Sequence, residues 1–169
     1  MSYYNKRLHN GTSYESKLRS LQNELYSEIG WIVENLSFSH SKADLFMWNS
    51  DIKVLVWEEV KSTNDVEFRF NTKDLVEQRD RLLELSKKDP AYYWVYFVGS
   101  VGWVYFPLYK CVGKKISYKD GYYFDINYPK TISSYIDNIN DYVNNIDTYR
   151  SQIESGKLLN ESENTNKKV

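Results

Sequence analysis

Apolar residues near the start of the chain follow a helical spacing. They recur at intervals of three and four, at Leu18, Leu21, Leu25 and Ile29, which places them on one face of an amphipathic helix. Thr12 or Ser13 is the expected cap of its first turn. Gly30 is expected to end it. The pattern therefore predicts a first helix over residues 12–29.

The next part of the chain predicts strands. Three runs are rich in β-branched and aromatic residues, namely 31–38, 43–48 and 52–62. Asn49-Ser50-Asp51 is typical of a hairpin turn between the second and third runs. Segment 64–71 is polar apart from Phe68 and Phe70, and we expect a loop or a short extension there.

A second helix is predicted over 73–88, capped by Asn71 or Thr72 and ending before Asp89-Pro90. The stretch from Ala91 to Tyr109 has no charged residue and is long enough to cross a bilayer. Its aromatic and β-branched content, a Gly-Ser-Val-Gly interruption and Pro107 favour two strands of a buried hairpin instead.

The last third predicts a short hairpin over 114–126, turning at Asp120-Gly121. Helical spacing then returns over 130–154. The order of elements predicts one α/β domain over 12–154, with a mixed sheet and helices on its faces. The second helix is long enough for a parallel crossover between two strands. We expect residues 1–11 to be flexible and residues 155–169 to form a disordered tail.

Composition narrows the function classes. The 169 residues include 17% aromatic residues and carry a net charge of -1, so the chain is no polycationic coat for nucleic acid. A single cysteine, Cys111, excludes an internal disulfide and fits a reducing cytoplasm. One cysteine and two histidines cannot build a conventional structural zinc site.

The candidate catalytic residues are Asp44, at the start of the predicted hairpin, and Glu59-Val60-Lys61, near the end of its second strand. Side chains alternate along a strand, so Glu59 and Lys61 share a face. Leu55 and Trp57 are expected on that face, whereas the opposite face carries Val54, Val56 and Val60. Counting outward from Ser50 puts Asp44 opposite Val56, three residues short of Glu59. A bulge or added twist is therefore expected to bring the two carboxylates together.

Two converging carboxylates suit a hard cation such as Mg²⁺ or Mn²⁺, which polarises a phosphate and activates water. Lys61 would orient that water or stabilise negative charge on the phosphate. The alternative is that Glu59 and Lys61 form a solvated pair on an edge strand.

A family resemblance covers about residues 11–108 and rests on the motifs GTSYE, SHSKADLFMW, VLVWEEVKS and GWVYFPL. Through these motifs the chain resembles the PD-(D/E)xK nuclease superfamily, and within it the archaeal Holliday junction resolvases. The resemblance implies a restriction-endonuclease-like α/β fold with an αβββαβ core and a C-terminal helical addition. It also implies a Mg²⁺-dependent deoxyribonuclease in which Asp44, Glu59 and the carbonyl of Val60 hold metal and Lys61 is catalytic.

The resemblance implies further site residues. Glu15 matches an acidic residue on the first helix, with Glu24 and Glu28 as substitutes; the alternative for Glu15 is a carboxylate favoured by the helix dipole. Gln78 matches a polar residue on the helix after the motif, or is simply an exposed helix residue. Archaeal resolvases carry a serine before the aspartate, whereas here His40 holds that position. The expected DNA contacts near it are Ser39, His40, Ser41 and Lys42.

No sequence-reading motif is present, so we expect recognition of DNA structure or ends rather than of base sequence. A homodimer with exposed aromatic residues at its interface is expected, with no membrane partner. The location is expected to be the cytoplasm, and the Tyr-, Asn-, Lys- and Ile-rich composition favours an AT-rich virus or mobile element. The alternative function is a catalytically inactive nuclease-like module that binds DNA or protein.

Overall fold

The computed structural model describes the backbone of residues 3–36 and 43–166 and the side chains of residues 14–36 and 43–156. Its helices are α1 (Tyr3–Tyr26), α2 (Lys73–Leu85), α3 (Pro129–Asn144) and α4 (Ile146–Asn166). Its strands are β1 (Trp31–Asn35), β2 (Leu45–Asn49), β3 (Val54–Thr63), β4 (Glu67–Arg69), β5 (Ala91–Phe97), β6 (Gly102–Pro107), β7 (Lys115–Ser117) and β8 (Tyr122–Tyr123). Short 3₁₀ turns are η1 (Ser27–Ile29), η2 (Leu108–Lys110) and η3 (Tyr118–Asp120).

The main sheet has six strands in the order β1-β2-β3-β5-β6-β8. β3 and β5 are parallel, and the other neighbours are antiparallel. Helix α2 makes the crossover between β3 and β5, as its length predicted. Apart from the three-residue β4, which precedes α2, the chain follows the predicted αβββαβ order: α1, β1, β2, β3, α2 and β5. The predicted fold class, a mixed sheet flanked by helices, is therefore confirmed.

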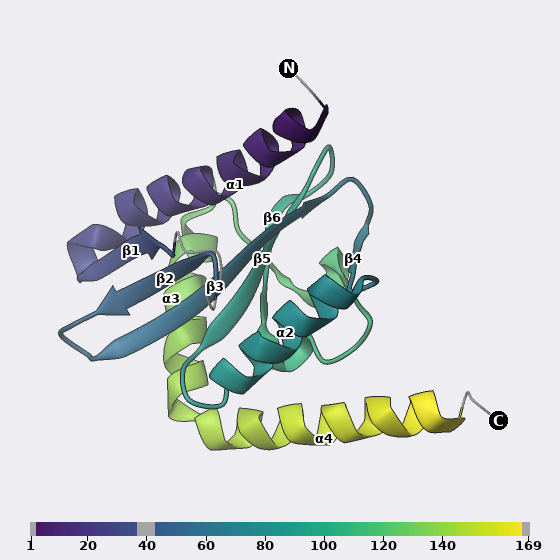
Figure 1. Cartoon of the computed structure of the whole chain (residues 1–169). Coiled ribbons are helices and arrows are strands. Elements are labelled where there is room, and N and C mark those ends of the chain that lie inside the picture. The colour runs from purple at the N-terminus through teal and green to yellow at the C-terminus, as the bar shows by residue number, and fades with distance from the viewer. Residues whose placement is uncertain (1–2, 37–42, 167–169) are drawn as a thin grey trace.

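Helices cover both faces of this sheet (Figure 1). On one face α1 and α3 pack against buried side chains such as Val56 and Trp94. On the other face α2 packs with the small β4-β7 sheet, around residues such as Tyr93 and Leu82. The buried side chains of β3 therefore enter one of two separate cores, depending on their position in the strand's alternation.

Both ends of the predicted domain differ from the sequence expectation. α1 begins at Tyr3, before the expected caps Thr12 and Ser13, and so enters the range expected to be flexible. Extending a helix already anchored by packing costs little compared with starting one. The spacing over 130–154 resolves into two helices that meet at Asn145, and α4 continues to Asn166. The assignment of 12–154 as a single domain stays a prediction.

The predicted hairpin over 114–126 is wrong. β7 pairs with β4, and β8 pairs with β6, because Ile116 is buried in the α2-side core while Gly121 leads the chain to the far edge of the main sheet. Segment 64–71 accordingly contains β4. The predicted β5-β6 hairpin between Ala91 and Tyr109 is confirmed. Within the described ranges, no helix is long and apolar enough to cross a membrane.

The Gly121→Ala variant tests the attachment of β8. An added Cβ would lie against Val104 and 2.6 Å and 2.8 Å from two ring atoms of Phe106, both buried residues. Overpacking of this kind costs roughly 1–3 kcal/mol, which urea unfolding would show as a lower midpoint. Gly113→Ala is the matched control, since its Cβ would meet nothing closer than 3.9 Å. Equal midpoints for the two variants would contradict the placement of Gly121 against β6.

Candidate active site

The β2-β3 hairpin places Asp44 beside Glu59. Its turn occupies Ser50–Lys53, so Asn49 pairs with Val54 and Leu45 pairs with Glu58. The backbone N–H of Asp44 donates to the carbonyl of Glu58 at 3.1 Å, although Leu45 is the residue paired with Glu58. Asp44 therefore lies beside the end of β3 that carries Glu59. Asp44 and Leu45 both lie opposite Glu58, which is the irregular pairing of a bulge, as expected from the sequence.

The observed register differs from the one counted outward from Ser50, which placed Asp44 opposite Val56, because the turn is longer than expected. The side-chain Oδ1 of Asn49 accepts the backbone N–H of Asp51 at 3.0 Å and that of Ile52 at 3.4 Å. Lys53 closes the turn with a φ of 55°, in the left-handed region. The hairpin is thus centred beyond Asp51 rather than at Ser50, which moves the partner of every residue in β2 along β3.

Asp44 is half-buried where β2 begins. Its Oδ2 accepts the backbone N–H of Val60 at 2.8 Å. The carboxylate therefore takes the place that a further residue of β2 would occupy beside β3. This contact fixes Asp44 to the strand that carries Glu59.

Glu59 and Lys61 share a face, as predicted, with Lys61 Nζ 3.4 Å from Glu59 Oε1. Glu59 is only 1% exposed, and β3 is an interior strand. The alternative of a solvated pair on an edge strand is therefore wrong. Burial raises the pKa of Glu59 well above its usual range and the nearby Asp44 carboxylate raises it further, while Lys61 opposes both. The partners of the buried Glu59 carboxyl are therefore the Asp44 carboxyl and the Lys61 amine.

Glu15 on α1 belongs to the same cluster. Its pKa is raised to about 8 by burial and by Asp44, and is lowered in part by Lys61. The substitutes Glu24 and Glu28 are exposed. Because α1 begins at Tyr3, Glu15 lies well inside the helix, so the alternative of a carboxylate stabilised by the helix start is wrong.

The other predicted residues are not joined to this cluster by the described contacts. Gln78 is half-buried on α2, and its predicted role is not tested by any contact described for it. Ser39, His40, Ser41 and Lys42 lie outside the described residues. Among the basic residues, Arg79 is engaged internally: it donates to the carbonyl of Gly113 at 2.5 Å and stacks on Phe70.

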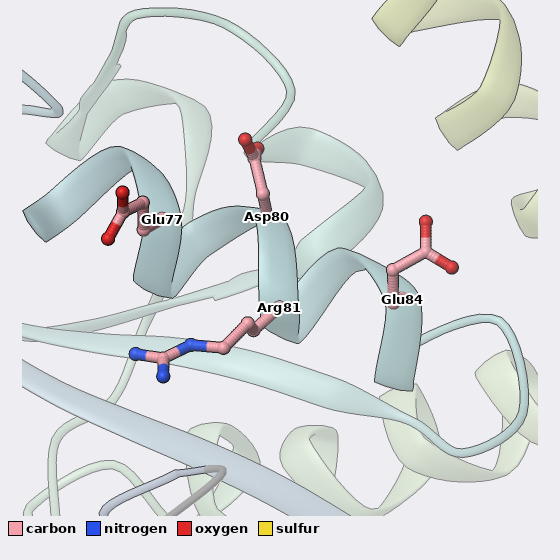
Figure 2. Close-up of a pocket in the computed structure, with 4 residues that line it drawn as sticks. All are labelled: Glu77, Asp80, Arg81 and Glu84. Atoms are coloured by element: carbon pink, nitrogen blue, oxygen red, sulfur yellow. The ribbon is translucent and has the colours of Figure 1, made fainter. Parts of the chain in front are cut away.

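An open pocket lies on α2 rather than at the carboxylates (Figure 2). Its lining side chains are Glu77, Asp80, Arg81 and Glu84. Figure 2 shows Asp80 and Glu84 directed away from Arg81. Three acidic groups around one arginine disfavour a DNA phosphate, so this pocket adds nothing to the site.

Glu58 is the buried residue that sequence reasoning missed. It lies on the opposite face of β3 from Glu59 and is fully buried. Its Oε2 accepts hydrogen bonds from Gln22 Nε2 and from the Tyr135 hydroxyl, each at 2.6 Å. The signal was present in the alternation, because Glu58 falls on the apolar face of Val56 and Val60. A carboxylate on that face had to be buried.

A divalent cation fits the residues present. Asp44 and Glu59 offer hard oxygen donors from neighbouring strands, and the like charge of Asp44 raises the pKa of the buried Glu59, which a divalent cation between them would offset. In the described part of the chain, no group of three or more His, Cys, Asp or Glu is arranged to hold a metal ion. Further ligands would therefore have to come from a backbone carbonyl, such as that of Val60, and from water.

No protein-family model and no curated protein matches the sequence. Among solved structures, the chain is similar to a Holliday junction resolvase from the archaeal hyperthermophile Archaeoglobus fulgidus. The two are 22% identical with a TM-score of 0.47, over 68% of this chain and 92% of the resolvase. The roles of Asp44, Glu59 and Lys61 therefore depend on the geometry of this chain and not on that likeness.

The stability of the protein should fall as pH rises through the neutral range. Burial raises the pKa of Glu58 from 4.5 to about 7 although Tyr135 and Gln22 donate to it. The folded protein thus keeps a proton that the unfolded chain has lost, so the stabilisation is complete below the unfolded pKa and disappears as pH passes the folded one. The loss is roughly 3 kcal/mol for this group.

Urea unfolding at about pH 5 and about pH 8 measures this loss. Glu58→Gln should reduce the difference between the two pH values, because it removes the titrating proton and keeps an oxygen that accepts hydrogen bonds. Part of the difference should persist, since the pKa values of Glu15 and Glu59 are raised as well. Glu24→Gln, at an exposed position on α1, should leave it unchanged. The same pH dependence in both variants would contradict the raised pKa of Glu58.

Proposed function

We propose that the protein is a metal-dependent nuclease that hydrolyses phosphodiester bonds in DNA. One observation carries the proposal: Asp44 accepts the backbone N–H of Val60 and raises the pKa of the buried Glu59, while Lys61 shares the face of Glu59 with its Nζ 3.4 Å away. Two carboxylates and a lysine at one point of an interior strand form a compact set of metal ligands and a cation. The sequence resemblance to PD-(D/E)xK nucleases assigns these same residues.

Each residue has a role in this proposal. Asp44 and Glu59 would hold Mg²⁺ or Mn²⁺, with the Val60 carbonyl as a further ligand. When bound, such an ion polarises a phosphate and lowers the pKa of water. Lys61 stabilises negative charge on the phosphate or orients the attacking water. Glu15, whose pKa is raised by burial and by Asp44, completes the acidic cluster and can exchange a proton with water there.

Substrate recognition is proposed to follow DNA structure or ends, as in junction resolvases. The net charge of -1 does not favour extensive nonspecific binding to the phosphate backbone. Ser39, His40, Ser41 and Lys42 directly precede Asp44 in the sequence, and we assign them to the DNA contacts by this connectivity. Gln78 on α2 is proposed as an accessory polar residue. A homodimer would present two such sites to a branched DNA.

Cleavage of four-way-junction, linear duplex, single-stranded and plasmid DNA with Mg²⁺ or Mn²⁺ tests the proposal. Glu59→Gln should lower the rate by at least about 100-fold, because it removes a metal ligand together with the partner of Lys61. EDTA should abolish cutting. Glu15→Gln should reduce the rate by about 10- to 100-fold, whereas the matched exposed variant Glu24→Gln should cut like the wild type.

The outcomes separate the possible functions. Preference for the four-way junction would identify a resolvase, and preference for linear duplex would identify an end-processing nuclease. Cutting that persists unchanged in Glu59→Gln would refute the assigned site. If the folded wild type binds DNA or a protein partner but cuts none of these substrates, the protein is an inactive nuclease-like binding module instead.

A further inference from the structure

Tyr93 is the neighbour of Glu59 on the opposite side from Asp44. The parallel register of β3 and β5 pairs Glu59 with Tyr93. Both side chains lie on the α2 side of the sheet, and Tyr93 is 0% exposed. Sequence patterns do not predict this pairing, because the register of two strands joined by a helix depends on how that helix packs.

The hydroxyl of Tyr93 has no hydrogen-bond partner among the described residues. A buried hydroxyl without a partner is unfavourable, and phenylalanine would fill the same space without that cost. The ring is held in place by an edge contact with Phe70, with ring centres 5.4 Å apart. The unpartnered hydroxyl therefore has a defined position beside Glu59, the residue paired with Tyr93 across the two strands.

The charge of the Glu59 carboxylate affects the pKa of the Tyr93 hydroxyl. Burial raises the pKa of Tyr93, and the Glu59 carboxylate is the next largest cause. Asp44 raises the pKa of Tyr93 as well, whereas Arg79 lowers it. The hydroxyl thus lies within reach of the charges of the carboxylate pair, although no direct hydrogen bond joins it to either one. One water between the two side chains would give the Tyr93 hydroxyl a partner and add a donor to the Glu59 carboxylate.

We propose that Tyr93 is a positioning residue for the metal site: its hydroxyl donates to one buried water that in turn donates to Glu59, and this holds the carboxylate in the orientation that binds a divalent cation. The inference rests on the proposed nuclease function. Outer groups that orient a metal ligand contribute to metal affinity without touching the ion. Tyr93 acts here through Glu59 and does not contact substrate.

Tyr93→Phe tests this role because it removes only the hydroxyl. Mn²⁺ binding, followed by electron paramagnetic resonance of the free ion, should weaken about 10- to 100-fold. Tyr142→Phe is the matched control: Tyr142 is also fully buried, but on the α1 and α3 side of the sheet. It should bind Mn²⁺ like the wild type. Both variants should unfold cooperatively in urea with EDTA present, since neither loses a direct side-chain contact with the proposed ligands.

Four outcomes bear on the inference. Weaker binding in Tyr93→Phe alone supports it. Binding within about twofold of the wild type overturns the role of Tyr93 and leaves the nuclease proposal intact. A Tyr93→Phe variant without a cooperative unfolding transition would assign the hydroxyl a purely structural role and overturns the inference too. A wild type that binds no Mn²⁺, or a Glu59→Gln variant that binds it equally well, overturns the metal site itself.

Discussion

The structure depends on one constraint: β3 buries two consecutive carboxyl groups, one on each of its faces. Alternation along the strand sends Glu58 towards α1 and α3 and Glu59 towards α2. A buried carboxyl is unfavourable unless it keeps its proton or finds donors. Glu58 has a raised pKa and two strong donors. Glu59 has a raised pKa as well, but its partners are the Lys61 amine and a second carboxyl, that of Asp44. The two faces of one strand thus differ in how completely their charge is satisfied. This difference separates a structural residue from a candidate catalytic one.

The hydrogen bonds of Glu58 also orient helix α1, which carries Glu15 to the carboxyl cluster on the other side of β3. Gln22, which donates to Glu58, lies on α1 seven residues after Glu15. Seven residues make almost two helical turns, so the two side chains leave the same stripe of the helix. The hydrogen bond to Glu58 therefore fixes the rotation of α1 about its axis, and with it the side from which Glu15 approaches Asp44. Tyr135 anchors α3 to the same carboxyl, which ties both helices of that layer to β3.

Sequence patterns predicted the features that depend on neighbouring residues alone, such as helix caps and the faces of a strand. The Thr72 side chain accepts the N–H of Leu75 as the expected cap of α2, and the alternation of β3 put Glu59 and Lys61 on one face. The predicted register of β2 against β3 was wrong, because the register depends on the length of a turn that is held by the Asn49 side chain. The partners of β7 and β8, and the position of Tyr93 beside Glu59, depend on the packing of distant elements. Those contacts leave no periodic trace in the chain.

Burial of the carboxyl cluster links stability to the proposed metal chemistry. With a pKa of about 8, Glu15 carries a proton at neutral pH, and the raised pKa of Glu59 has the same direction. A divalent cation that binds Asp44 and Glu59 must displace such protons, so its binding strengthens as pH rises. The same rise in pH weakens the metal-free fold, because the ionised carboxyls then remain buried without a counter-charge other than Lys61. In the proposed nuclease, the cation therefore supplies the positive charge that this arrangement of residues lacks. The cation stabilises the fold most at high pH, where the carboxyls are ionised and also bind it most tightly.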